Sequence, residues 1–480
     1  MNRHRTIATG LLAVLALAIA PASAATPGAT AGRVHRAGRW LVDGQGRVVV
    51  AHGFNVVRKV APFVRTEFGD ADAQLLANEG FTVVRIGFIW EGVEPQPGRY
   101  DDAYVERVLA LDDLLARHGI RTLVDFHQDL WSRGTFGDGA PAWATLGANF
   151  NDAFAAFWRD DAGPSGVGIQ THFVRAWHHV ARQLRRHRNV LGLDPLNEAY
   201  PGSDYPPPCG PFTRCPAFES APLATFYRRV IRAIRAGGAA HPIFAEGVAD
   251  SGAAPPALPG FRDRQTAFTY HFYCLATQLS GAEVAVGTPS PEAETCAPIE
   301  SRQLGNFAQY ADQLGVPGFL GEFSCNDVNP DNAQVVDLVG QRFTSWTVWA
   351  YYNGADDPAD CPRQGLLRDD TQPPTGSNVK QAKLDALAVP YAAAIAGTPE
   401  GTTLDRTTRT YTLSYRSAPV PGVRLHRSAR TMIFVPARMY PAGYVANVSG
   451  ARVESPQDAR WLVLAADRNR TVSVTVTPRQ

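Results

Sequence analysis

Two glutamates are the strongest candidates for chemistry, because each lies at the end of a short apolar run typical of a buried strand. Glu198 lies in Leu-Asn-Glu-Ala and Glu322 in Leu-Gly-Glu-Phe. Two carboxyl groups on separate strands suit hydrolysis of a glycosidic bond: one protonates the leaving oxygen, and the other attacks the anomeric carbon or activates water. The carboxyl groups lie about 5–5.5 Å apart in retaining enzymes and about 6.5–9.5 Å apart in inverting ones. The sequence leaves both spacings open.

Further polar and aromatic residues gather near the predicted ends of other strands: Arg85, His127, Gln128, Asp129, Asn197, His271, Tyr273 and Trp349. A charge is costly to bury inside a strand, but at the carboxyl end of a barrel strand it can face a substrate. We expect Arg85 to keep Glu322 ionised and Tyr273 to donate a hydrogen bond to it. We expect Asn197 to bind a sugar 2-hydroxyl, and the charge of Glu322 to raise the pKa of Glu198.

Several of these residues also have a purely structural interpretation. Arg85 can simply pair with a barrel carboxylate, and Trp349 can be packing at the top of the barrel rather than a platform for a sugar. His127 and His271 can be structural histidines with satisfied hydrogen bonds. Glu246, in Phe-Ala-Glu-Gly, also ends a strand and is a further candidate for binding.

The elements that would position these residues form a repeating pattern. Short apolar, β-branched runs alternate with amphipathic helical stretches, which is typical of parallel βαβ units. The predicted strands are Val48–Asn55, Thr82–Phe88, Arg121–His127, Val190–Glu198, Pro242–Gly247, Ala267–Tyr273, Pro317–Phe323 and Ser345–Tyr352. The predicted helices include Asp101–His118, Phe173–His187, Ala224–Ala236 and Lys380–Ala396. Eight strands are the number that closes a (β/α)8 TIM barrel, whose active sites lie at the carboxyl ends of the strands.

Two predicted loops, about 128–170 and 199–221, are unusually long and follow strands, so they lie on the same face as the glutamates. Long insertions of this kind are usually lids or binding loops. The first contains seven large aromatic residues: Trp131, Phe136, Trp143, Phe150, Phe154, Phe157 and Trp158. They form either a lid over the site or a small, locally packed core.

The domain organisation follows from a change of pattern near Gly397. We predict that residues 33–396 form the α/β barrel. Beyond it, four short strands with turn residues between them predict a small all-β sandwich over residues 397–480: Thr410–Tyr415, Thr431–Val435, Trp461–Ala465 and Thr471–Thr477.

Overall composition excludes some functions. The chain has 480 residues, and its 46 Lys and Arg nearly balance its 45 Asp and Glu. No basic stripe stands out, so we predict no nucleic-acid partner. The cysteine spacings do not resemble a zinc site, and no carboxylate-rich ligand set accompanies the histidines. We therefore predict no metal and no cofactor.

The N-terminus has the pattern of a secretory signal peptide. A basic start at 3–5 is followed by an apolar run at 11–20 and the small residues Ala22-Ser23-Ala24. We predict that residues 1–24 are removed by cleavage near Ala24 and that the protein is secreted. The alternative is an uncleaved membrane anchor.

Six cysteines in an exported chain suggest disulfide bonds. Their order favours the local pairs Cys209–Cys215, Cys274–Cys296 and Cys325–Cys361. Six cysteines nevertheless allow about 15 connectivities, and the sequence does not choose among them.

The two glutamate motifs resemble the acid/base and nucleophile motifs of glycoside hydrolase family 5, a retaining family with a (β/α)8 barrel. The resemblance extends, in order along the chain, to Arg85, His127, Asn197, His271, Tyr273 and Trp349, which fall on that family's active-site positions. The usual motif is Asn-Glu-Pro, and Ala199 replaces the proline here without touching the carboxylate.

A narrower resemblance is to the endoglycoceramidase branch of that family. It rests on Gly-Phe-Asn-Val-Val-Arg-Lys-Val-Ala-Pro from Gly53, Trp-Glu-Gly-Val-Glu-Pro-Gln-Pro-Gly from Trp90, and Asp-Phe-His-Gln-Asp-Leu-Trp-Ser from Asp125. The resemblance implies cleavage of the β-glycosidic bond between a glycan and ceramide. It also implies that Lys59, His127 and Asp129 contact the sugar next to the ceramide, and that the aromatic loop helps to form an apolar channel for the lipid.

The expected partner is therefore a glycosphingolipid or another hydrophobic glycoside, with transient contact to a membrane surface. One alternative is a β-glycosidase acting on flavonoid or steryl glycosides. Others are a noncatalytic glycolipid-binding barrel and a metal-dependent barrel hydrolase. The intact pair of glutamates argues against a pure binding protein, and the poor ligand set argues against the metal enzyme.

Overall fold

The structure is a computed structural model, and it describes residues 32–205, 209, 214–249, 252, 254–354, 361 and 364–479. The predicted signal peptide lies outside the described residues. Within them, no helix is both long enough and apolar enough to cross a bilayer.

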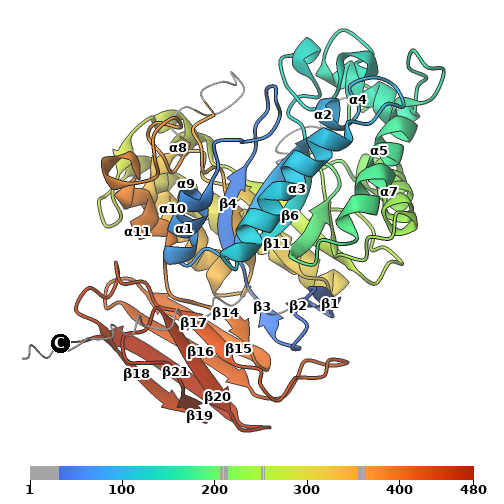
Figure 1. Cartoon of the computed structure of the whole chain (residues 1–480). Coiled ribbons are helices and arrows are strands. Elements are labelled where there is room, and N and C mark those ends of the chain that lie inside the picture. The colour runs from blue at the N-terminus through green and yellow to red at the C-terminus, as the bar shows by residue number, and fades with distance from the viewer. Residues whose placement is uncertain are drawn as a thin grey trace, which may run out of the picture.

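A closed barrel of eight parallel strands forms the centre of the molecule (Figure 1). Each strand pairs in parallel with its neighbours, and β13 closes the ring by pairing with β4. The strands are β4 (His52–Val56), β5 (Val83–Ile89), β6 (Arg121–His127), β7 (Val190–Asp194), β8 (Ile243–Glu246), β9 (Thr266–Phe272), β11 (Gly318–Phe323) and β13 (Ser345–Val348). The predicted TIM barrel is therefore confirmed.

Helices surround this barrel, and the longer ones bury an apolar face against it. They are α1 (Asp70–Asn78), α2 (Trp90–Val93), α3 (Asp102–Arg117), α4 (Phe150–Arg159), α5 (Ile169–Leu184), α6 (Pro216–Phe218), α7 (Ala224–Ala236), α8 (Leu275–Ser280), α9 (Pro291–Leu314), α10 (Asn329–Gly340) and α11 (Gln381–Leu387). In α3, the Asp101 side chain accepts a hydrogen bond from the Tyr104 N–H and caps the helix. The apolar side chains of Tyr104, Val108, Leu111 and Leu115, which lie along one side of this helix, are buried.

Two predicted strands end or begin elsewhere, for identifiable reasons. The run predicted over Val190–Glu198 stops as a strand at Asp194, where Pro195 has no N–H to continue the ladder. The run predicted over Val48–Asn55 splits into β3 (Val48–Val49), which belongs to another sheet, and β4. Glu198 therefore lies in a loop rather than on a strand.

The helix predicted over Lys380–Ala396 is wrong in its second half. Helix α11 ends at Leu387, and after Pro390 the alanine-rich segment becomes β14 (Tyr391–Ile395). Alanine favours helix in isolation, but β14 pairs on both sides, with β17 and β3, and these ladders override the local preference. The C-terminal domain therefore begins before the predicted boundary at residue 397.

That domain is a sandwich of two antiparallel sheets. One sheet has the order β1-β2-β3-β14-β17-β20-β19 and the other β15-β16-β21-β18. The first contains β1 (His35–Ala37), β2 (Trp40–Val42), β3, β14, β17 (Thr431–Phe434), β20 (Trp461–Ala466) and β19 (Ala451–Val453). The second contains β15 (Thr398–Asp405), β16 (Thr410–Arg416), β21 (Thr471–Pro478) and β18 (Tyr444–Ser449). Side chains of both sheets share one apolar core, so the predicted sandwich is confirmed, with N-terminal strands added.

The sandwich packs beneath the amino ends of the barrel strands, away from the predicted active face (Figure 1). His52, at the start of β4, is stacked between Trp346 and Tyr391, with ring centroids 4.4 and 3.8 Å away. The Tyr391 hydroxyl donates a hydrogen bond of 2.7 Å to the Gly80 carbonyl. The C-terminal domain thus supports the barrel from the end opposite the strand ends that carry the glutamates.

This interface predicts a stability difference between two glycines. Gly80 has a φ of +80°, and an added Cβ would lie 2.5 Å from ring atoms of Phe434. Gly38 has a φ of +60° but open space around it. We expect Gly80→Ala to lower the free energy of unfolding by about 2–3 kcal/mol more than Gly38→Ala, because both substitutions are strained but only one overpacks. Thermal and urea unfolding measure this, and equal losses in the two variants would contradict it.

Candidate active site

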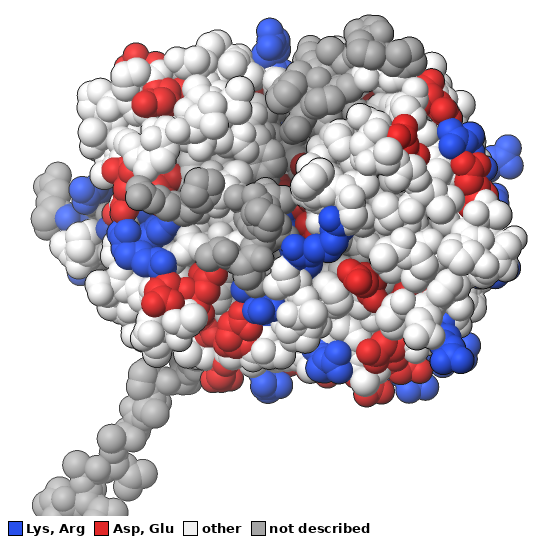
Figure 2. All heavy atoms as spheres, turned by 90° about the horizontal axis from the view of Figure 1, so that it is seen from above, with Lys and Arg blue, Asp and Glu red and all other residues white. Residues whose placement is uncertain are grey.

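The two predicted catalytic glutamates lie at the carboxyl end of the barrel. Glu322 is part of β11, and Glu198 lies in the loop after β7 with a φ of 45°. Figure 2 looks down on this face and shows a hollow with charged side chains around it. Both glutamates are buried, with exposed fractions of 8% for Glu198 and 4% for Glu322.

Neighbouring strands hold the loop that carries Glu198. The Gln128 side-chain amide, after β6, donates hydrogen bonds to the carbonyls of Asn197 (2.7 Å) and Glu198 (2.9 Å). A carboxylate oxygen of Glu246, at the end of β8, accepts the Glu198 N–H at 3.1 Å. The loop is thus fixed on both sides, which compensates for the uncommon backbone conformation at Glu198.

The spacing of the two carboxyl groups favours a retaining reaction. His271 Nδ1 lies 3.0 Å from Glu198 Oε1 and 3.5 Å from Glu322 Oε2. One oxygen of each glutamate and this nitrogen all lie within 4.8 Å of one another. Retaining glycosidases place the carboxyl groups about 5–5.5 Å apart, whereas inverting ones need about 6.5–9.5 Å to admit a water molecule.

Glu322 is held by one hydrogen bond to each oxygen. Arg85 Nη1 lies 2.6 Å from Oε1, and the Tyr273 hydroxyl donates a hydrogen bond of 2.6 Å to Oε2. Burial opposes the charge of Arg85, but Asp125, Asp194 and Glu322 together raise its pKa well above the ordinary value. Both contacts expected from the sequence are present, so each carboxylate oxygen of Glu322 accepts a hydrogen bond.

Glu198 has the opposite electrostatic environment. Burial, as the largest cause, and the negative charge of Asp129 raise the pKa of Glu198 to about 7. The sequence points to Glu322 as the source of this shift, but burial and Asp129 come first. Burial lowers the pKa of His271 to about 4, so this neighbour of Glu198 is neutral at pH 7. Glu198 can therefore carry a proton at neutral pH, as a general acid requires.

A second polar cluster adjoins the glutamates and contains the other predicted sugar-binding residues. His127 Nε2 lies 3.3 Å from Asp129, and Lys59 forms an ion pair with the same carboxylate. Burial opposes protonation of His127, but Asp129 and Asp125 raise its pKa well above the ordinary value. The Trp349 ring stacks on His127, with centroids 5.1 Å apart, and Lys59 Nζ lies 4.6 Å from the Trp349 ring centroid.

Asn197 is largely committed to protein contacts. Its side-chain oxygen accepts a hydrogen bond of 2.8 Å from Arg85, and its amide nitrogen donates one of 2.9 Å to the Gln128 carbonyl. The second N–H of this amide is what remains for a sugar hydroxyl. Asn197 therefore positions Arg85 as well as bordering the site.

Sequence reasoning missed three residues that complete the site. Asp125 and Asp194 lie 3.1 and 2.8 Å from the Arg85 guanidinium, and Asn55 Oδ1 accepts a hydrogen bond of 3.0 Å from it. Asp125 could have been found, because residues two apart on a strand point to the same side, and it precedes His127 by two. Asn55 and Asp194 are single polar residues in apolar runs. Because a polar side chain is costly to bury without a partner, each could have been predicted to contact another buried polar group.

Part of the aromatic loop after β6 forms a local core. Trp131, Phe154 and Phe157 are buried, and the Trp131 ring lies 5.0 Å from each of the two phenylalanine rings. Phe136 is the exception, with 91% of its surface exposed. The alternative of a small, locally packed core therefore holds for these three buried rings, and a contribution of the loop to a lipid channel stays a prediction.

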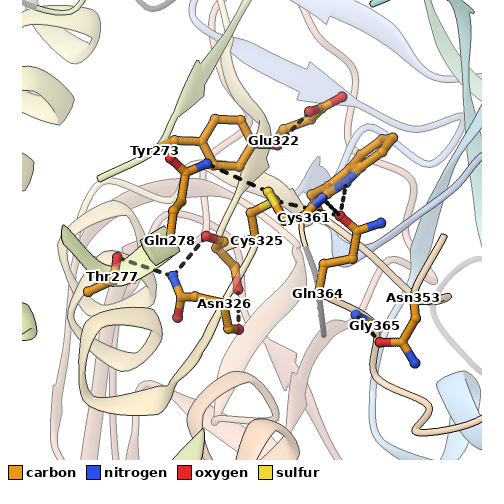
Figure 3. The surroundings of a disulfide bond; sticks show 12 residues. Tyr273, Thr277, Gln278, Glu322, Cys325, Asn326, Asn353, Cys361, Gln364 and Gly365 are labelled. Atoms are coloured by element: carbon orange, nitrogen blue, oxygen red, sulfur yellow. Dashed lines mark hydrogen bonds between the residues drawn. A yellow bond between two sulfur atoms is a disulfide. The ribbon is translucent and has the colours of Figure 1, made fainter. Parts of the chain in front are cut away.

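All three predicted disulfides are present: Cys209–Cys215, Cys274–Cys296 and Cys325–Cys361. The third lies beside the active site, three residues after Glu322 (Figure 3). It joins the segment after β11 to the segment that leads into Gln364.

The same geometry bears on the metal-dependent alternative. Glu198, His271 and Glu322 have donor atoms close enough together to ligate a cation. Arg85 and Tyr273 already occupy the oxygens of Glu322, however, and a cation there would meet the positive charge of Arg85. The arrangement suits an ionised nucleophile beside a protonated acid better than a metal site.

Comparison with known proteins agrees with this geometry. Residues 42–355 match the model of the cellulase family (glycosyl hydrolase family 5), and residues 390–477 match the glycoside hydrolase family 5 C-terminal domain. The chain is 28% identical to endoglycoceramidase I of Rhodococcus hoagii (strain 103S) over 460 residues, which cover 92% of this chain and 87% of the relative.

Solved structures of endo-glycoceramidase II from Rhodococcus sp. are also similar. Its ganglioside GM3 complex superposes with a TM-score of 0.74 at 25% identity, covering 91% of this chain and 98% of that one. Its lactosyl-enzyme intermediate gives a TM-score of 0.71 at 25% identity, covering 90% and 98%. The chain belongs to glycosyl hydrolase family 5, and within that family to its endoglycoceramidase-like branch.

Proposed function

We propose that this protein hydrolyses the β-glycosidic bond between the glycan and the ceramide of glycosphingolipids, with retention of configuration. The observation that carries the proposal is the pair Glu198–Glu322, at retaining distance and in opposite electrostatic environments. Similarity over most of the chain to endoglycoceramidases, one of them solved with a ganglioside, supports the substrate class.

The reaction is a double displacement. A carboxylate oxygen of Glu322 attacks the anomeric carbon while Glu198 gives its proton to the glycosidic oxygen, and ceramide leaves as an alcohol. Glu198, now ionised, takes a proton from water, whose oxygen attacks the same carbon and releases Glu322. The hydrogen bonds from Arg85 and Tyr273 orient the nucleophile and stabilise its charge before attack and after release.

The sugar next to the scissile bond binds against the cluster of Lys59, His127, Asp129 and Trp349. Lys59 and His127 are donors, Asp129 is an acceptor, and Trp349 supplies an apolar face, so together they match the hydroxyl groups and the C–H face of a sugar. Contacts among these four residues hold them in one arrangement before substrate arrives. Asn197 and His271 border the same space beside Glu198.

The lipid side of the site faces the rim of the barrel. Three large apolar side chains are exposed on segments that follow β6 and β9: Phe136 (91%), Leu275 (59%) and Leu279 (75%). Leu275 and Leu279 are one turn apart on α8, on the same side of the helix. Their position on the face that carries the glutamates supports transient contact with a membrane surface, from which ceramide would be reached.

We also propose that the protein is secreted. The basic, apolar and small-residue segments of residues 1–24 support an exported chain, and so does the pairing of all six cysteines, because disulfides persist in oxidising compartments.

A substrate panel tests the proposed function. We expect release of intact oligosaccharide and ceramide from a ganglioside or lactosylceramide in detergent micelles, followed by thin-layer chromatography. A flavonoid diglycoside and a steryl glucoside serve as comparison substrates. Cleavage of these two with intact glycosphingolipids left untouched would overturn the proposed substrate.

The roles of the two glutamates predict a loss of hydrolysis in both Gln variants and rescue by azide in Glu198→Ala. Glu322→Gln and Glu198→Gln should each lose hydrolysis of a glycolipid by about 100- to 10,000-fold, because each removes one of the two groups that make and break bonds. Azide should restore turnover of an activated aryl β-glycoside by Glu198→Ala, since azide needs no general base. The matched control is Glu67→Gln, a partly exposed glutamate outside the site, which should keep activity within about twofold. Near-normal activity of either active-site variant would contradict the assignment.

The environment of Glu198 predicts a pH dependence. The acid must be protonated, so kcat/KM should fall as pH rises through about 7. Asp129→Asn removes a negative charge that raises this pKa and leaves the charges of Lys59 and His127, which lower it, so the alkaline limb should move to lower pH. Asp113→Asn, on the exposed side of α3, is the control and should leave the profile in place. An unchanged or alkaline-shifted limb in Asp129→Asn would show that the Asp129 charge does not raise the pKa of Glu198.

A further inference from the structure

Both the main chain and the side chain of Trp349, which follows barrel strand β13, are fixed by hydrogen bonds. Its backbone N–H donates to the Phe323 carbonyl at 2.9 Å, and its own carbonyl accepts the Cys325 N–H at 3.1 Å. The segment that follows the nucleophile therefore fixes the main chain of Trp349. Its indole is fixed separately, by Gln364.

Gln364 is the hydrogen-bond partner of the indole. Its side-chain oxygen accepts the Trp349 Nε1–H at 2.7 Å and the Cys361 backbone N–H at 3.1 Å. Sγ of Cys325 lies 3.5 Å from the same oxygen. The glutamine is buried, with an exposed fraction of 1%, so water cannot replace this acceptor at low cost.

The Cys325–Cys361 disulfide closes these contacts into a ring. The backbone N–H of Cys325 donates a hydrogen bond to the Trp349 carbonyl, and the backbone N–H of Cys361 donates one to the Gln364 side-chain oxygen. The disulfide joins the two cysteines, and the Gln364 oxygen joins back to the indole. Figure 3 shows Gln364 directed toward this disulfide, with Tyr273 and Glu322 nearby.

The main chain around Gln364 is also anchored. Its carbonyl accepts a hydrogen bond of 2.6 Å from Nζ of Lys383, a buried residue of α11. The next residue, Gly365, runs so close to the chain at Tyr352 and Asn353 that an added Cβ would lie 2.6 Å from their backbone atoms. The acceptor for the indole is thus placed by the fold and not by the side chain alone.

The orientation of this ring matters for the site because charged residues pack on it. His127 stacks on the Trp349 ring with an interplanar angle of 8°, and Lys59 Nζ lies 4.6 Å from its centroid. A rotation of the indole would remove a cation–π contact and the stacking that orients both cations. Lys59 and His127 in turn hold Asp129.

We propose that Gln364 is a positioning residue for the reaction: through the indole N–H of Trp349 it fixes the ring on which Lys59 and His127 are arranged, and the Cys325–Cys361 disulfide keeps Gln364 in place. This proposal rests on the proposed function only in that Trp349 borders the bound sugar. It concerns turnover of any β-glycoside by this site, with or without a lipid.

A double-mutant cycle tests the proposal, with an aryl β-lactoside as substrate. Gln364→Leu should lower kcat/KM by about tenfold in the wild-type background, as expected for the loss of one buried acceptor. In the Trp349→Phe background, which has no indole N–H, the same substitution should cost less than about twofold. Gln364→Glu keeps an acceptor oxygen in either protonation state and should retain most of the activity. Gln372→Leu, an exposed glutamine, is the matched control.

The disulfide supplies an independent arm of the same experiment. Cys325→Ser/Cys361→Ser should lose activity in the wild-type background and little more in the Trp349→Phe background, whereas Cys209→Ser/Cys215→Ser should lose little in either. This arm also stands in if Gln364→Leu fails to fold, as judged by its thermal unfolding curve. Equal losses in the two backgrounds, or full activity of Gln364→Leu, would overturn the proposal.

The aryl substrate keeps this outcome separate from that of the proposed function. A wild-type enzyme that cleaves the aryl lactoside but no glycosphingolipid would refute the proposed substrate, and the double-mutant cycle could still be measured with the aryl lactoside. A wild-type enzyme that cleaves both, together with a cycle that shows no coupling, would refute the positioning role alone.

Discussion

The active face depends on an imbalance of buried charge. Around the Arg85 guanidinium lie three carboxyl groups, those of Asp125, Asp194 and Glu322, and all are largely removed from water. His127 adds a second positive charge beside Asp125, but two cations do not compensate three anions at low dielectric, so part of the negative charge must be neutralised by protons. Burial accordingly raises the pKa of Asp194 to about 7.

The same excess of buried negative charge surrounds Glu198. It lies apart from Arg85, beside a neutral His271 and another buried carboxyl group, that of Glu246, and burial raises the pKa of both glutamates. Glu322, in contrast, receives the strongest donors, Arg85 and Tyr273. The difference between an acid and a nucleophile thus follows from burial and the charge of Asp129 at Glu198, and from the two hydrogen-bond donors at Glu322.

Much of the active face could be predicted from the sequence. Barrel strands appear there as apolar runs, and most functional residues appear as polar residues that interrupt these runs near their ends. His127, His271 and Glu322 are such interruptions, whereas Arg85 lies in the interior of β5. The long-range partners could not be predicted in the same way. Gln364 lies in an irregular segment, and its closeness to Trp349 depends on a disulfide and on Lys383, which no local pattern reveals.

The errors have different physical origins. Alanine-rich β14 resembles a helix when local propensity is weighed without its two pairing partners, and here tertiary contacts decide the outcome. The position of Glu198 in a loop follows from a local signal, because Pro195 lacks the N–H that a central strand needs.

The seven-stranded sheet of the sandwich takes its first three strands from residues 35–49 and the rest from beyond residue 390. Segments from before and after the barrel in the sequence are therefore neighbours in one sheet. The chain as far as β14 must be available before β14 can pair with β3. This pairing spans a large sequence separation, and closing so long a loop costs conformational entropy before the contact is gained. The sandwich therefore ties together two segments that flank the barrel in the sequence, and so couples the folding of the two domains.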